Sequence, residues 1–149
     1  MNCPYTMIYI QPLDIPANTP ASAPLTATMQ LSAGTISLVA IQFPSGVNAL
    51  AHLQIWNGLH HLCPTNQKGD FATGAETIVW DEDQVIDQPP FTLTLIGWNT
   101  DTAYDHTITT RIAMAPLAVA VNPQSQINLL LGTGGTGVEG PATYPLINP

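Results

Sequence analysis

The sequence has almost no positive charge. Lys68 and Arg111 are its only Lys and Arg residues, against ten Asp and Glu residues, which gives a formal net charge of −8 at pH 7. A surface that binds DNA or RNA neutralises phosphates with many Lys and Arg side chains. Anionic membrane surfaces attract proteins through the same basic residues. The composition therefore excludes direct binding to nucleic acid and to anionic membranes.

Cysteines and long apolar runs are also scarce. The two cysteines, Cys3 and Cys63, are too few for a disulfide framework and form no CxxC motif. The longest apolar run, residues 112–121, contains Pro116, and a membrane helix needs about twenty residues. The N-terminus also lacks the basic stretch and apolar core of a secretory signal. We therefore expect no membrane span, and if the protein leaves its cell, it does so by lysis or assembly, or its signal has been removed.

The residue types that are abundant are uncharged and typical of β-structure. Apolar residues make up 45% of the chain, which is enough to bury a core. Thr, Asn, Gln, Ser, Gly and Pro dominate the remaining positions, and these residues favour strands and turns over helices. Short strands recur from residue 25 onward, with turn residues between them and no helical interval. About eight strands at this spacing predict an all-β fold, an antiparallel β-sandwich or jelly roll over residues 25–121.

Proline and glycine predict extended arms on both sides of this sandwich. Prolines recur every four residues in the N-terminal segment, which excludes a helix or a central strand there. We expect residues 1–24 and the Gly/Pro-rich residues 122–149 to drape over an adjacent subunit, so that deleting residues 1–23 leaves a folded domain. The expected contacts lie in these arms and in one hairpin turn, at Pro12, Pro16, Pro20, Pro24, Asn57, Gly58, Ile127, Leu129, Leu131 and Tyr144.

The strongest turn signal also suggests a metal candidate. Asn57-Gly58 is the preferred dipeptide for a two-residue hairpin turn. A turn centred there places His52 opposite Cys63, with His61 on the same face. Imidazole and thiolate groups are zinc ligands, but the spacing indicates no fourth ligand. A packed or subunit-facing surface is therefore the favoured interpretation, and we expect no metal and no cofactor.

Acidic turns offer weaker candidates for calcium. Asp81 and Asp83 follow a short strand predicted at residues 77–80, and Asn99, Asp101 and Asp105 lie in the turn after a later strand. Neither turn has the residue pattern of a dedicated calcium loop, so solvated acidic turns are favoured.

The sequence gives less support to a catalytic site than to a calcium site. Ser45 lacks the G-x-S-x-G nucleophile elbow, and the glycines of residues 132–137 lack the Lys-Ser/Thr of a phosphate loop. An enzyme is the least supported class. Trp56, Trp80 and Trp98 end predicted strands, where a ring is either a sugar-stacking platform or, as we prefer, a lid on the core.

The whole pattern favours a part of an assembly. Lys and Glu side chains are depleted at protein interfaces, and this chain has very few of them. Residues 35–114, with an FPSG turn, a WNG hairpin, a PTN loop and a GWN turn, resemble small capsid, decoration and tail β-sandwich proteins of bacterial viruses. The resemblance implies a jelly roll, often dimeric or trimeric, mounted on a second structural protein such as a major capsid protein.

The leading hypothesis is therefore a non-enzymatic structural protein of a virion. Two alternatives stay open. One is a carbohydrate-binding or adhesion module that uses a strand-end tryptophan beside the turn of Asn99, Asp101 and Asp105. The other is a subunit of an extracellular surface filament, which differs from the first hypothesis only in symmetry.

Overall fold

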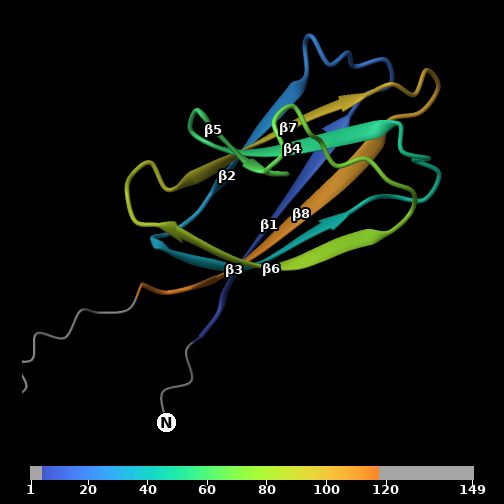
Figure 1. Ribbon diagram of the computed structural model, residues 1–149. Helices are drawn as coiled ribbons and strands as arrows, with labels where there is room; N and C mark the ends of the chain where they lie inside the picture. The colour runs from blue at the N-terminus through green and yellow to red at the C-terminus, as the bar shows by residue number, and fades with distance from the viewer. Residues whose placement is uncertain (1–4, 118–149) are drawn as a thin grey trace, which may run out of the picture. The chain divides into compact units, whose positions relative to one another are not determined.

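Residues 5–117 are described by a computed structural model, and they form two four-stranded antiparallel sheets packed face to face (Figure 1). One sheet contains, in spatial order, β1 (Met7–Ile15), β8 (His106–Ala115), β3 (Gly34–Gln42) and β6 (Thr77–Ile86). The other contains β2 (Leu25–Gln30), β7 (Thr92–Asn99), β4 (Ala51–Asn57) and β5 (His60–Cys63). Within this part of the chain, no helix has the length and apolar character needed to cross a membrane.

The strands pair as one long hairpin that is folded over on itself. β1 pairs with β8, β2 with β7, β3 with β6 and β4 with β5, and every pair is antiparallel. Successive nested pairs belong alternately to the two sheets. This is the strand order of a jelly roll, an eight-stranded double sheet. The predicted all-β sandwich is therefore confirmed.

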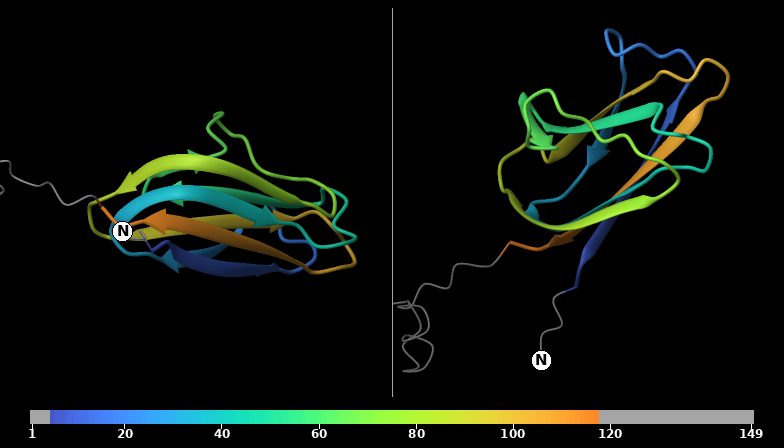
Figure 2. Two further views of the ribbon diagram at one scale, coloured as in Figure 1. Left: turned by 90° about the horizontal axis from the view of Figure 1, so that it is seen from below. Right: turned by 45° about the vertical axis from the view of Figure 1, so that its right-hand side comes forward.

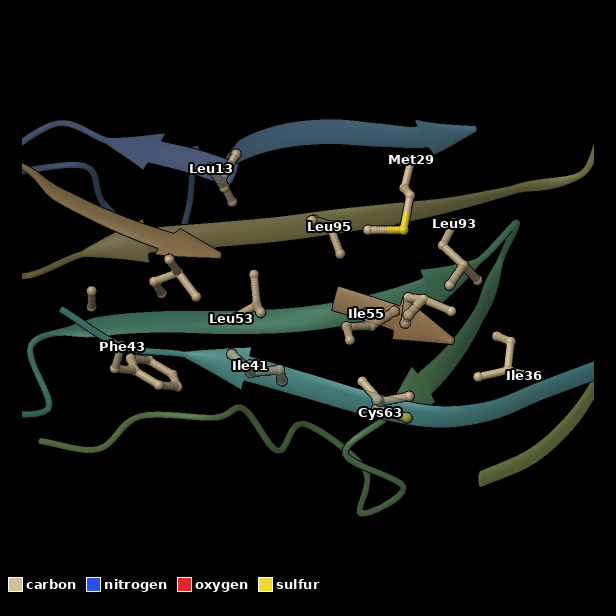
Figure 3. Packing of buried hydrophobic residues seen from close by; sticks show 14 of the residues in the cluster. Leu13, Met29, Ile36, Ile41, Phe43, Leu53, Ile55, Cys63, Leu93 and Leu95 are labelled. Carbon is tan, nitrogen blue, oxygen red and sulfur yellow. The ribbon is translucent and has the colours of Figure 1, made fainter. Parts of the chain in front are cut away.

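The core lies between the sheets because apolar residues alternate with polar ones along each strand. In β7, for example, Leu93 and Leu95 are fully buried while the threonines beside them are partly exposed. Burying one such side chain stabilises the fold by about 1.5–3 kcal/mol. Figure 3 shows the two layers meeting at Leu13, Met29, Ile36, Ile41, Phe43, Leu53, Ile55, Cys63, Leu93 and Leu95.

The N-terminal segment belongs to this core, and the prediction of an arm over residues 1–24 was wrong for β1. Leu13 and Ile15 are buried, and β1 pairs with β8 along its whole length. Gly97 on the opposite sheet makes room for them, because a Cβ there would lie 2.6 Å from a methyl of Ile15 and 2.7 Å from one of Leu13. Pro12 is tolerated because β1 is an edge strand, where a missing N–H costs little. The edge position is visible in Figure 2, left.

Other boundaries follow the prediction more closely. β8 ends at Ala115, just before Pro116, as expected. β6 runs on to Ile86, so Asp81 and Asp83 are exposed residues in the middle of an edge strand rather than in a turn. Pro16, Pro20 and Pro24 lie in the connection from β1 to β2. The predicted second arm, with Ile127, Leu129, Leu131 and Tyr144, lies outside the described residues and stays a prediction.

Candidate interaction surfaces

The β4–β5 hairpin turns one residue later than the sequence suggested. Asn57 pairs with His60, so the turn residues are Gly58 and Leu59 rather than Asn57-Gly58. Gly58 has a φ of +58°, which a glycine adopts without steric cost. The shift leaves the Leu59 side chain fully exposed at the tip.

This register separates the predicted metal ligands. His61 lies opposite Trp56 on the outer face of the sheet, whereas Cys63 lies opposite Ile55 and faces the core. The pairing also contains a β-bulge, because the neighbours Trp56 and Ile55 pair with His61 and Cys63, and the extra residue Leu62 puts these two side chains on opposite faces. Within residues 5–117, no three His, Cys, Asp or Glu side chains are grouped to hold a metal ion.

The Cys63 thiol is also in an unreactive environment. Burial in the core, reinforced by the nearby carboxylate of Glu82, raises the pKa of the Cys63 thiol to about 11. The sulfur lies 4.0 Å from Oε2 of Glu82, which also accepts a hydrogen bond from the indole N–H of Trp80. Because the thiolate is the reactive and metal-binding form, this cysteine serves packing.

The turn after β7 is a hydrogen-bonded structural network. Backbone N–H groups of Ala103 and Tyr104 donate to Oδ1 of Asp101, and Oδ2 lies 2.9 Å from Nε2 of His106. The Ala103 N–H, followed by the His106 ring, lowers the pKa of Asp101.

The two other residues that were considered for calcium in this turn, Asn99 and Asp105, are also hydrogen-bonded within the protein. The side-chain amide of buried Asn99 donates to backbone carbonyls of Ile15 and Tyr104, and Asp105 accepts from the backbone N–H of Ala17. The three residues considered for calcium therefore hold the turn against the start of the β1–β2 connection.

A row of rings and amides occupies the outer face of β4 and its neighbours. We call this the aromatic row, and its members are His52, Gln54, Trp56, His61 and Trp98. His52 stacks on Trp98 with ring centroids 5.0 Å apart, and Trp56 stacks on His61 at 4.9 Å. The interplanar angles are 7° and 14°. The preferred lid interpretation is thus wrong for Trp56 and Trp98, while Trp80 packs against the core beside Phe71.

The loop of residues 64–76 fixes the aromatic row in place. Its residue Phe71 forms a bridge with Leu53, so the loop runs along the free edge of β4. Asp70 consequently lies 2.7 Å from Nδ1 of His52, and the carbonyl of Gly69 accepts a hydrogen bond from the Gln54 amide. The loop and the hairpin enclose a hollow of about 470 Å³, lined by Gln54, Trp56, Leu59, His61, Gln67 and Lys68.

The outer face of the other sheet exposes large apolar side chains on its two edge strands, together with the charged residues Asp14, Asp81, Asp83 and Arg111. We call it the apolar face. Ile8 and Ile10 of β1 are 66% and 59% exposed, and Val79 of β6 is 54% exposed. Between these edges, Ala113 lies opposite both Ile8 and Leu38, so small and apolar side chains continue across the sheet. Figure 2, left, looks onto this sheet.

Sequence reasoning did not single out the apolar face. Its signal in the sequence was a short apolar run, residues 7–10, but the prolines that follow favoured an arm over a strand. The face carries Arg111 as its only cation, and that guanidinium donates a hydrogen bond to Gln42 of the neighbouring β3.

Comparisons with known proteins give likenesses of fold only. No protein-family model and no curated protein matches the chain. A chain of the cyanophage Pam1 capsid asymmetric unit is 10% identical, with a TM-score of 0.49 over 75% of this chain and 85% of the other. A chain of tomato aspermy virus is 13% identical, with a TM-score of 0.44 over 76% of this chain and 81% of the other. FLHE is 9% identical, with a TM-score of 0.40 over 74% of this chain and 97% of the other. All three TM-scores lie below 0.5, so the chain's own surfaces have to carry the functional argument.

Proposed function

We propose that this chain is a non-enzymatic structural protein of a virion, a capsid, decoration or tail component, which assembles with further copies of itself. The observation that carries the proposal is the apolar face on a jelly roll. Eight-stranded jelly rolls are a common architecture of viral capsid domains. Its large exposed apolar side chains include Ile8 and Ile10, which are neighbours on the β1 edge, and an exposed apolar patch marks an interaction site.

The occupant that the chemistry fits best is a second copy of this chain. β1 is an edge strand, so the backbone N–H and C=O groups on its free side have no strand partner within residues 5–117. Pro12 removes one N–H group from this strand, so residues 7–11 are the stretch that pairs with another edge, and two copies related by a two-fold axis place these stretches against each other. Ile8 and Ile10 of the two copies then lie side by side on one face of the joined sheet.

The few charges of the apolar face suit a contact between copies. Arg111 lies beside Ile10 in the paired register, and the acidic residues Asp14 and Asp81 lie on the same sheet. Protein interfaces are depleted in Lys and Glu, and neither residue type lies on the exposed strands β1 and β8.

The test is the mass of the full chain in solution, measured by light scattering coupled to size exclusion. We expect the wild type to associate as its concentration rises, and Ile10→Asp to remain monomeric. Leu59→Asp is the matched control, because Leu59 is an equally apolar, fully exposed residue on the other sheet. A monomeric wild type, or equal loss of association in both variants, would overturn the proposal.

A further inference from the structure

The hollow beside the aromatic row has the dimensions and construction of a ligand site. Its volume of about 470 Å³ lies within the usual range of small-molecule pockets, roughly 300–1,000 Å³. Its walls combine the Trp56 and His61 rings and Leu59 with the amides of Gln54 and Gln67 and the ammonium of Lys68. The hollow lies on the sheet opposite the apolar face, so the proposed assembly leaves it open.

The rings are held in position before any ligand arrives. Trp56 stacks on His61, and its indole N–H donates to Oε1 of Gln54 over 3.1 Å. The Gln54 amide in turn donates to the carbonyl of Gly69 over 2.7 Å. Trp56 is absent from the core cluster between the sheets, so this network does not serve core packing. Pre-organised aromatic surface at a solvent-facing hollow is typical of a binding site.

Lys68 gives the hollow its charge. It is the only lysine of the chain, and its backbone φ of +63° lies in the left-handed region that side chains other than glycine rarely adopt. The ion pairs found within residues 5–117 join His52 to Asp70 and His106 to Asp101, so the Lys68 ammonium has no carboxylate partner there. Strained residues of this kind cluster at ligand clamps.

We propose that the hollow binds an acidic glycan. The apolar C–H face of a sugar ring packs on the Trp56 indole, the Gln67 amide takes its hydroxyl groups, and its carboxylate pairs with Lys68. Lys68 brings the only formal charge that lines the hollow, and that charge is positive.

The experiment compares each acidic sugar with a neutral sugar of matched structure by isothermal titration against the full chain. The probes are trigalacturonate and sialyllactose, each compared with its own methyl ester. We expect at least one acidic sugar to bind ten or more times tighter than its neutral match. Lys68→Gln should remove that preference, and Lys68→Arg should restore most of it.

Two further variants separate a site from a general charge effect. Trp56→Ala, checked for folding by circular dichroism, should abolish binding of both members of a pair. Arg111→Gln removes the only other Lys or Arg side chain, on the opposite sheet, and should leave sugar binding unchanged. Failure of both acidic sugars to bind, equal binding of acid and neutral match, or equal losses in Lys68→Gln and Arg111→Gln would overturn the proposal. None of these results bears on assembly through the apolar face.

Discussion

Two isoleucines on the same strand should behave in opposite ways when they are shortened to alanine. Ile15 is fully buried against Gly97 of the opposite sheet, whereas Ile10 points outward on the apolar face. Removing the buried side chain of an isoleucine costs about 2–5 kcal/mol, because the lost apolar contact adds to the cost of the cavity. A domain of this size has a total stability of roughly 5–15 kcal/mol. Ile15→Ala should therefore remove a large part of it.

Ile10→Ala is the control within the same strand. A substitution on an exposed surface changes stability by about 0.5 kcal/mol or less. Urea unfolding followed by far-ultraviolet circular dichroism, at protein concentrations low enough for the monomer to dominate, gives both values. Ile10→Ala should instead weaken self-association, since it shortens a side chain of the proposed seam. Equal stability losses, or a neutral Ile15→Ala, would refute the assignment of β1 to the core and restore an arm.

Two other perturbations test the packing and the buried network. Gly97→Ala should destabilise the fold by about 1–3 kcal/mol in the same urea experiment, because the new Cβ meets the methyls of Leu13 and Ile15. Gly74→Ala is the control and should be close to neutral, because a Cβ at Gly74 meets nothing within 4 Å. Acidification tests Asp101, whose folded-state pKa lies below its ordinary value near 3.8. Its contribution to stability is complete above that value and is lost as pH falls through the folded pKa. The melting temperature of Asp101→Asn should thus fall less than that of the wild type between pH 7 and about pH 2, and identical profiles would contradict the role of the carboxylate.

The fold class could be predicted because period-two alternation and turn residues are local signals. Residues 25–31 and 106–114 alternate clearly, and the structure has strands β2 and β8 there. β1 was missed because a proline in an edge strand looks the same in sequence as a proline in an arm. Only its pairing with β8, the most distant strand along the chain, distinguishes the two cases.

The candidate sites were harder to predict because they depend on register and on long-range contacts. The later turn pairs Trp56 with His61, and a β-bulge at Leu62 then turns Cys63 into the core. The position of Lys68 beside these rings depends on the path of a whole loop, which bridges to β4 only at Phe71. No local pattern encodes either fact. Trp56 was considered as a sugar platform from its strand-end position, but its partners came from the fold.

Electron cryomicroscopy of the assembly that the full chain forms tests the central claim most directly. The account predicts that β1 is extended by the β1 strand of a neighbouring copy, with Ile8 and Ile10 in contact with the same residues of that copy. An assembly in which the β1 edge is free and the contacts lie elsewhere would contradict it. A chain that stays monomeric at every concentration would contradict it as well.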